Sequence, residues 1–319
     1  MNSPKVSICI PCHNAAPYVG AALDSALAQT WPNLEIIVVD DDSTDESAAV
    51  LESYADRGVK IITEKCGSAA KARNRAWAEA TGDYIKFFDA DDILSSGCVA
   101  QQLEVLAGYP NSIAASEWGR FYQDDLGTFK SNPKSVWRDL PSSDWLIEDW
   151  MDGKPMTQPG MFLIPRKLID LSGPWSDGPL LHEAPNDDFE FFARLFCHAD
   201  TIRFTPEAIL YYRSGLFDSL SKRSSRAAVE ALCHCLLKGT QYLIDLRSDA
   251  AARLASANLL QQFIYSQYPN HSDLIKRMQL RICTLGGSNL PPDGPPRFQK
   301  LRKLVGWKIA RRIQRLAGH

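Results

Sequence analysis

Two clusters of aspartates each follow directly on a run of apolar residues. Asp40-Asp41-Asp42 comes after Ile36-Ile37-Val38-Val39, and Asp89-Ala90-Asp91-Asp92 comes after Tyr84-Ile85-Lys86-Phe87-Phe88. Continuous apolar runs are typical of parallel strands buried in an α/β sheet, whose ligands bind beyond the carboxyl ends of the strands. We therefore expect both clusters to line one ligand site at one end of the sheet.

The chemistry open to these carboxylates is divalent metal binding. Hard carboxylate oxygens suit Mg²⁺ or Mn²⁺, which proteins often hold through one or two carboxylates plus substrate phosphates. Asp89 and Asp91, one residue apart, could hold a nucleotide diphosphate in this way while the first cluster holds the nucleoside. The alternative is that the acids cap helices, because Ser43-x-x-Glu46 has the capping-box pattern and the helix dipole favours acids in a first turn.

The elements that must position these acids alternate along the first half of the chain. Short apolar strands are predicted at 5–10, 34–39, 59–63 and 83–88, and helices near 17–28, 44–55 and 69–80. This alternation is the signature of βαβ units in a parallel sheet. The first strand is not followed by G-x-G-x-x-G, and the chain has no G-x-x-x-x-G-K-[ST], so the glycine loops of dinucleotide and P-loop sites are missing.

Five motifs in order resemble family 2 of the inverting glycosyltransferases: Val6-Ser7-Ile8-Cys9-Ile10-Pro11-Cys12-His13-Asn14, Gln29-Thr30-Trp31-Pro32, the Val39 to Asp45 block, Ala72-Arg73-Asn74, and Phe88-Asp89-Ala90-Asp91-Asp92. The resemblance covers roughly residues 4 to 213. It implies the GT-A fold, a Rossmann-like mixed sheet flanked by helices, here with a C-terminal helical extension. Two departures stand out: Cys12-His13 replaces a hydroxyl-bearing residue and Tyr, and Asp42 replaces a common Gly.

The resemblance implies transfer of a sugar from a nucleotide diphosphate to an acceptor hydroxyl by a single inverting displacement, in cell-surface glycan or polysaccharide synthesis. The family counterpart of Asp41 accepts a hydrogen bond from the base, Pro11 and Asn14 shape the first loop, and Arg73 lies on the nucleotide side. A carboxylate that accepts from a ring N–H suits uracil or thymine better than cytosine, so UDP-sugars lead and dTDP-sugars follow.

The resemblance also assigns the catalytic groups. Asp91 is the expected ligand of Mn²⁺ or Mg²⁺, with Asp89 on the ribose or as a second group at the metal, and Asp92 is expected to cap a helix. The general base is carried over to Asp188, with Asp187 as runner-up, and the alternative is that these acids cap their helix. Arg213 is either a diphosphate contact or part of a structural ion pair.

The acceptor side is predicted from the irregular stretch between 110 and 180. Sugars stack on exposed aromatic faces, and this stretch holds five tryptophans, of which three are expected in the core. The candidates for the acceptor side are Trp137, Gln158, Trp175, His182 and Glu183; Gln158 comes from the turn Thr157-Gln158-Pro159-Gly160. The acceptor is expected to be a glycan or a lipid-linked glycan.

The composition suits a large globular chain of 319 residues, 45% of them hydrophobic. We expect a catalytic domain at 1–213, with a nucleotide half to about 110 and an acceptor half from about 111. A helical extension at 214–285 has helical patterns near 224–245, 249–266 and 272–284. A linker rich in Gly and Pro at 286–296 leads to a tail helix at 297–319.

The tail is the most basic part of the chain. It holds eight Lys and Arg and no acid, so it carries +8 while the whole chain carries −3 and the rest −11. Apolar residues at steps of three or four form one predicted stripe: Phe298, Leu301, Val305, Ile309, Ile313 and Leu316. Such a helix can lie on an anionic membrane; the alternative is docking on the acidic body of the protein. Nucleic acid is a poorer partner because no recognition fold accompanies the basic stripe.

The remaining signals exclude other classes. No basic-then-apolar segment precedes the first strand and no apolar run reaches about 18 residues, so the expected location is cytoplasmic, with the tail as a means of peripheral attachment to the inner face of the membrane. The eight cysteines are expected to be reduced core thiols, and Cys9-Ile10-Pro11-Cys12 lies in a predicted strand. A sugar nucleotidyltransferase would carry a Gly-rich loop where Pro11 to Asn14 stands, and a silent nucleotide-sugar scaffold would have lost Asp91 or Asp188.

Overall fold

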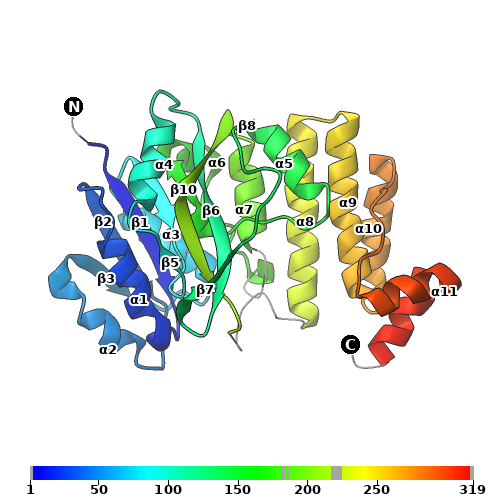
Figure 1. The fold of residues 1–319 in the computed structure, drawn as a ribbon, viewed down its shortest axis with the longest axis horizontal. Helices are drawn as coiled ribbons and strands as arrows, with labels where there is room; N and C mark the ends of the chain where they lie inside the picture. The colour runs from blue at the N-terminus through cyan, green and yellow to red at the C-terminus, as the bar shows by residue number, and fades with distance from the viewer. Residues whose placement is uncertain (1–2, 182–183, 185–186, 217–224, 317–319) are drawn as a thin grey trace.

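The computed structural model describes residues 3–181, 184, 187–216 and 225–316. Within them, ten strands form one mixed sheet in the order β3-β2-β1-β4-β9-β6-β10-β5, with β7 paired to β6 and β8 paired to β10 (Figure 1). The strands are β1 Val6–Cys12, β2 Leu34–Asp40, β3 Val59–Thr63, β4 Tyr84–Phe87, β5 Ile93–Leu94, β6 Ile113–Tyr122, β7 Asp125–Ser131, β8 Leu140–Pro141, β9 Phe162–Pro165 and β10 Thr201–Arg213.

The first half of the sheet is parallel, as the alternating pattern predicts. Strand β1 pairs in parallel with both β2 and β4, and β2 pairs in parallel with β3. Residues on both faces of β1 and β2 are buried, which explains why the strands read as continuous apolar runs. The carboxyl ends of β1, β2 and β4 therefore meet at one end of the sheet, where both aspartate clusters begin.

Helices flank the sheet and then continue beyond it (Figure 1). The α-helices of the catalytic half are α1 Ala16–Leu27, α2 Ser47–Glu52, α3 Ala69–Glu79, α4 Cys98–Leu106, α5 Ser142–Trp150, α6 Arg166–Ser172 and α7 Asp187–Phe196. Three short 3₁₀ turns cover Ala55–Arg57, Pro159–Met161 and Pro179–Leu181. The helix predicted at 44–55 is shorter than expected, and Ser43 does not cap it, because its hydroxyl donates to Asp40 instead. The capping-box interpretation is therefore wrong at this position.

The second half of the catalytic region is more regular than predicted. The ten-residue strand β6 pairs in parallel with β10, and β9 joins this pair to β4 through antiparallel contacts. Four of the five tryptophans between 110 and 180 are buried to 1% exposure or less, one more than expected: Trp118, Trp145, Trp150 and Trp175. Aromatic burial of this kind gives the acceptor half a core of its own, continuous with that of the sheet.

Three long helices stand side by side next to the catalytic half (Figure 1). They are α8 Arg226–Leu246, α9 Ala250–Gln267 and α10 Ser272–Leu285, close to the predicted bounds. Helix α8 packs on α7, and a Cβ at Gly239 of α8 would come within 3.0 Å of Phe189 and 3.2 Å of Ala193. Since α7 begins with Asp187 and Asp188, the extension supports the helix that carries the expected base. The domain bounds given above stay a prediction.

The tail forms one more helix, α11 Pro296–Leu316, which is kinked at Gly306 (φ 78°). It lies beyond α10 in Figure 1. Among the described residues, no helix is both long enough and apolar enough to cross a membrane. All eight cysteines are free, and five of them are buried. Burial raises the pKa of the Cys12 thiol to about 12, which does not suit a redox role.

Candidate functional site

The loops after β1 and β2 are tied together by short polar side chains. Asn14 has a left-handed backbone (φ 49°), its N–H donates to Ser43 Oγ at 3.0 Å, and its Oδ1 accepts from the N–H of Thr44 at 2.8 Å. Pro11, at the end of β1, lies beside Val39 of β2. Both residues thus fix the shape of the loops, and whether they also touch a nucleotide stays a prediction.

Asp41 is held in a fixed orientation at the end of β2. Its Oδ1 accepts from the N–H groups of Cys66 and Gly67, each at 2.7 Å, and His13 Nδ1 donates to its carbonyl oxygen at 2.7 Å. Asp41 is 8% exposed, and within the described part of the chain its carboxylate accepts hydrogen bonds at Oδ1 and none at Oδ2. Asp42 has a φ of 55°, a left-handed conformation that explains why glycine is common there in the family it resembles.

The second cluster follows β4 and is crowded with negative charge. Burial and the nearby Asp89 raise the pKa of Asp91 to about 6. Asp92 is 1% exposed and its Oδ1 accepts from the N–H of Arg213 at 2.9 Å. The expectation that Asp92 caps a helix is wrong, because the next helix begins at Cys98, and the carboxylate instead joins the loop after β4 to the end of β10.

Arg73 joins the second cluster to the start of α7. Its Nη2 donates to Asp89 Oδ1 at 2.8 Å and its Nη1 donates to Asp187 Oδ2 at 3.0 Å. The guanidinium lies 4.4 Å from the ring centroid of Trp175, and that ring stacks at 4.1 Å on Phe191. Arg73 is 5% exposed, so it acts here as a buried bridge between two carboxylates.

Trp175 does not offer the exposed face that was expected of an acceptor-side residue. Its side chain is 1% exposed, and it packs between Phe87, Phe191 and the guanidinium of Arg73. Asn74 fixes the Trp175 backbone with two hydrogen bonds of 2.9 Å, one to its carbonyl oxygen and one from its N–H. The prediction for Trp175 is therefore corrected: its ring packs against the guanidinium of Arg73 and holds it in place.

The two acids at the start of α7 differ in their partners. Asp187 Oδ1 accepts from the N–H of Asp188 at 2.9 Å, while its Oδ2 pairs with Arg73. Asp188 Oδ1 accepts from the N–H of Phe189 at 2.9 Å, and its Oδ2 faces Thr157 Oγ1 at 3.4 Å. Burial and then the charge of Asp187 raise the pKa of Asp188 to about 7, with Arg73 opposing. Of the two carboxyls, Asp188 is thus the one that is not bound by an arginine of the described residues.

Arg213 lies at the end of β10 in a structural ion pair. Its side chain is 4% exposed and forms a salt bridge with Asp124. Its Nε donates to the Asp91 carbonyl at 2.6 Å, and its guanidinium lies 4.9 Å from the Tyr18 ring centroid. The guanidinium therefore fixes the loop that carries Asp91, while a contact with a diphosphate stays a prediction.

The remaining acceptor-side candidates lie in different surroundings. Trp137 is half-buried and stacks on Phe204 at 5.4 Å. Gln158 is half-buried in the turn that brings Thr157 to Asp188. His182 and Glu183 lie outside the described residues. Sequence reasoning missed the roles of Asn74, Asp124 and Thr157; the signals available for Asn74 and Thr157 were the motifs in which they occur.

The carboxylates suit a cation that is shared with a ligand. Five aspartates and two arginines make up the site as described, namely Asp89, Asp91, Asp92, Asp187 and Asp188 with Arg73 and Arg213. No group of three or more described His, Cys, Asp or Glu residues is placed to hold a metal alone. Two carboxylates fit Mg²⁺ or Mn²⁺ when phosphate oxygens of a ligand complete the coordination shell of the cation.

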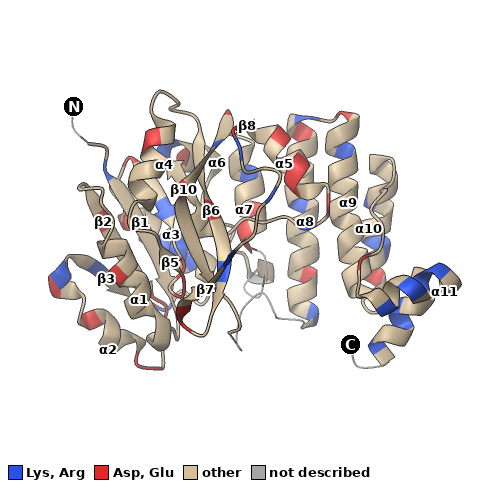
Figure 2. Ribbon diagram, in the orientation of Figure 1, with Lys and Arg blue, Asp and Glu red and all other residues tan. Residues whose placement is uncertain are grey.

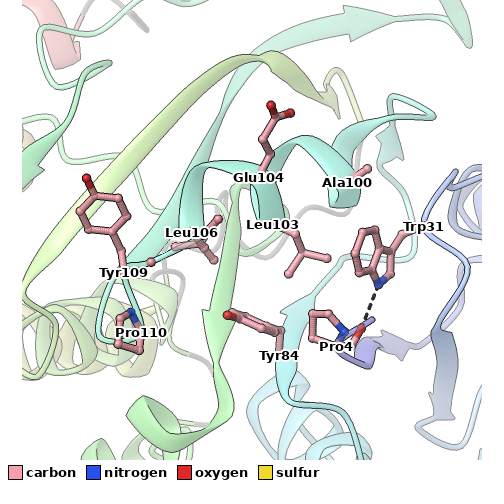
Figure 3. Close-up of a pocket in the computed structure, with 11 residues that line it drawn as sticks. Pro4, Trp31, Tyr84, Ala100, Leu103, Glu104, Leu106, Tyr109 and Pro110 are labelled. Atoms are coloured by element: carbon pink, nitrogen blue, oxygen red, sulfur yellow. Dashed lines mark hydrogen bonds between the residues drawn. The ribbon is translucent and has the colours of Figure 1, made fainter. Parts of the chain in front are cut away.

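An apolar groove of about 630 Å³ lies at the opposite end of the strands (Figure 3). Its lining includes Pro4, just before β1, Tyr84 at the start of β4, and Leu103 and Leu106 of α4. Trp31 closes one side and donates from Nε1 to the Pro4 carbonyl at 2.9 Å. The groove is therefore separate from the aspartate clusters, which follow the carboxyl ends of the same strands.

Sequence comparisons agree with the motifs. The family described as glycosyl transferase family 2 matches residues 7–171. The putative glycosyltransferase EpsH of Bacillus subtilis is 28% identical over 72% of this chain and 67% of its own length. The glucosyltransferase WfgD of Escherichia coli, named as acting from UDP-Glc on α-D-GlcNAc-diphosphoundecaprenol, is 36% identical over 33% of this chain. In WfgD, as in several other relatives, less than half of that protein's length is covered.

Structural comparisons show the same fold. TarS 1-349 of Staphylococcus aureus in complex with UDP-GlcNAc superposes with a TM-score of 0.64 at 16% identity, covering 98% of this chain and 92% of that one. The mannosyltransferase PcManGT of Pyrobaculum calidifontis, in complex with GDP-Man and Mn²⁺, superposes with a TM-score of 0.56 at 16% identity, covering 99% and 88%. With the match over residues 7–171, these likenesses lead to one conclusion: the chain belongs to glycosyl transferase family 2 and has the GT-A fold.

Proposed function

We propose that this enzyme transfers a sugar from a UDP-sugar to an acceptor hydroxyl, with inversion and with the help of a divalent cation, in the synthesis of a cell-surface glycan. The support for the donor is the carboxylate of Asp41 together with the UDP-GlcNAc complex of TarS. The support for a lipid-linked or glycan acceptor is the relative WfgD, which is named as acting on a diphosphoundecaprenol substrate. A dTDP-sugar is the second choice of donor.

The nucleoside is assigned to the loops after β1 and β2. Asp41 Oδ1 is occupied by two backbone N–H groups, so Oδ2 is the atom left to accept a hydrogen bond from the ring N–H of uracil. Because those two hydrogen bonds fix the carboxylate before ligand arrives, little side-chain entropy is lost on binding. Asn14 contributes by holding the two loops together.

The diphosphate is assigned to Asp91 and Asp89. These two residues would hold Mn²⁺ or Mg²⁺ together with phosphate oxygens, and the cation would stabilise the negative charge on the departing diphosphate. Mn²⁺ in the PcManGT complex supports this choice of cation class. Arg73 holds the carboxylate of Asp89 in place, and Arg213 holds the backbone of Asp91.

The single observation that carries the assignment of the base is the difference between Asp187 and Asp188. Asp187 is paired with Arg73, which makes it a weaker proton acceptor, whereas Asp188 forms no ion pair with a described residue and has a pKa of about 7. A base whose pKa lies near the working pH is most effective in proton transfer. In the proposed step Asp188 takes the proton of the acceptor hydroxyl as the acceptor oxygen forms a bond to the anomeric carbon. The bond between that carbon and the phosphate oxygen breaks, and UDP leaves with the electron pair.

Thermal unfolding with a panel of nucleotides tests the donor. UDP, dTDP, GDP and CMP are each added with and without Mn²⁺ to wild-type protein and to Asp91→Ala. A ligand at about 100 times its Kd stabilises a protein by roughly 2.7 kcal/mol, enough for a shift of several degrees. The expected result is a Mn²⁺-dependent shift with UDP that Asp91→Ala loses. A larger shift with GDP or CMP would overturn the UDP assignment, and no shift with any nucleotide would overturn the nucleotide site itself.

A further inference from the structure

The C-terminal helix α11 is fixed to the protein by one of its faces. Phe298 is 3% exposed and Ala310 is fully buried. The Trp307 ring packs edge-on against Tyr265 and Tyr268, at 4.9 and 5.1 Å between centroids. Arg315 Nε donates to the Tyr268 carbonyl at 2.9 Å, and Arg311 Nη2 donates to the Asp293 carbonyl at 2.7 Å. Aromatic packing and hydrogen bonds to backbone carbonyls thus hold the helix. Among the described residues, its Lys and Arg side chains form no salt bridges with the acidic body.

The outer face of α11, the side turned away from the protein, exposes apolar side chains both before and after the kink. The stripe predicted from the sequence is divided by the kink at Gly306, and Phe298 turns inward. Among the described residues, five of the twelve large hydrophobic side chains with exposed surfaces belong to this one helix, namely Leu304 (82%), Val305 (38%), Ile309 (51%), Ile313 (45%) and Leu316 (88%). Such a concentration of exposed apolar side chains marks an interaction surface.

Exposed basic residues lie beside these apolar side chains. Lys308 and Arg312, four positions apart after the kink, are next in sequence to Ile309 and Ile313, and Lys303 lies before the kink. The Arg312 guanidinium lies 5.5 Å from the ring centroid of Tyr268, and Lys308 Nζ lies 5.9 Å from that of Trp307, but neither contact neutralises the charge. Helix α11 contains no acid. Figure 2 shows the helix with Lys and Arg along it and no Asp or Glu. Within the part of the chain that is described, no carboxylate forms a salt bridge with a basic side chain of α11. These charges therefore remain available to an anionic partner.

We infer that the outer face of α11 docks on an anionic lipid bilayer. An amphipathic helix with apolar residues on one side and Lys and Arg beside them lies in the plane of the headgroups, with its apolar side chains at the acyl boundary. Ile309 and Ile313 enter that boundary, and Lys308 and Arg312 contact acidic headgroups. Because its inner face is already packed on the protein, the helix is folded and oriented before it binds the membrane. Little conformational entropy is therefore lost on binding.

A second copy of the chain is the other occupant to consider. A two-fold dimer through this face would bring two helices together that carry Lys and Arg and no acid, and like charges across an interface are unfavourable. A bilayer with acidic lipids presents the opposite charge over its whole area. The inference does not depend on the assignments of donor or base, since it rests on residues remote from them in the sequence.

Sedimentation of the full chain with vesicles tests the inference. One set of vesicles is phosphatidylcholine alone, and the other is equal parts phosphatidylcholine and phosphatidylglycerol. The triple variant Lys303→Gln, Lys308→Gln, Arg312→Gln removes charge, and Ile309→Ser with Ile313→Ser removes apolar surface. Matched controls on other helices are Lys167→Gln, Lys238→Gln, Lys276→Gln for charge and Leu171→Ser with Leu280→Ser for exposed apolar side chains. Thermal unfolding of each variant checks that the fold is retained.

We expect wild-type protein to sediment with the acidic vesicles and not with phosphatidylcholine alone, and binding to fall at high salt. Three charges near the surface contribute enough that the triple variant binds roughly 100-fold more weakly, and the isoleucine variant roughly tenfold or more. The controls bind as wild type. Equal sedimentation with both lipids, unchanged binding in both α11 variants, or a dimer in solution that Ile309→Ser with Ile313→Ser dissociates would each overturn the inference.

Discussion

Replacing Asp188 by Asn should lower kcat by orders of magnitude and at the same time stabilise the protein above neutral pH. The Asp188 carboxyl has a pKa of about 7, raised from 3.8, so the folded state binds its proton more tightly than the unfolded state does. For a raised pKa, the stabilising contribution of the proton is complete below pH 3.8 and is lost as pH rises to about 7. At 1.36 kcal/mol per pKa unit, the ionised carboxylate costs at most about 4 kcal/mol of unfolding free energy above pH 7.

Asparagine keeps the size of the side chain but cannot ionise. The variant therefore does not lose unfolding free energy at this position as pH rises. Urea unfolding of wild type and Asp188→Asn is followed between pH 4 and pH 8, with the exposed Asp170→Asn of α6 as control. The stability of the variant relative to wild type should increase from pH 4 to pH 8 by up to about 4 kcal/mol, while the control shows no such trend. A difference that does not change with pH would refute the argument that Asp188 is destabilised as an anion.

Further predictions follow from the same contacts. In a transfer assay, Asp188→Asn should lower kcat by about 10² to 10⁴, while its affinity for UDP stays unchanged. In the same assay, kcat/KM of wild type should fall as pH drops below about 7, because the base becomes protonated. A kcat/KM that does not change with pH would contradict this prediction. Arg73→Gln leaves Asp89 and Asp187 without their partner and should lower the unfolding free energy by about 3 kcal/mol or more, whereas the exposed Arg57→Gln should cost less than about 1 kcal/mol. Gly239→Ala should cost about 1–3 kcal/mol through overlap with Phe189, and Gly178→Ala, with open space around it, serves as control.

The parallel half of the sheet could be predicted because its signals are local. Apolar runs such as Ile36 to Val39 give the strands, and the acids that follow them mark the end where ligands bind. The helices of the extension were placed to within a few residues by their apolar periodicity. The order of the motifs indicated the family, which the match over residues 7–171 confirms.

Contacts between distant residues could not be predicted in this way. Arg73 and Asp187 are 114 positions apart, and nothing in either neighbourhood says that they pair. Trp175 was expected on the surface because sugars stack on indoles, yet its place depends on two residues distant in sequence, Arg73 of α3 and Phe191 of α7, that lie against its ring. The kink at Gly306 had a sequence signal, namely a glycine within a helical pattern. The side of α11 that packs on the protein could not be predicted, because it depends on the contact of Trp307 with Tyr265 of α9 and with Tyr268 just after that helix.

The most direct test of the proposed site is calorimetric titration of UDP into wild type, Asp91→Ala and Asp188→Asn, with Mn²⁺ present and with Mn²⁺ removed by chelation. Our account predicts that wild type and Asp188→Asn bind UDP with the same Mn²⁺-dependent affinity, because the base does not contact the nucleotide. Asp91→Ala should lose the Mn²⁺-dependent part of the binding. Wild-type affinity and unchanged Mn²⁺ dependence in Asp91→Ala would contradict the assignment of the diphosphate to the loop after β4.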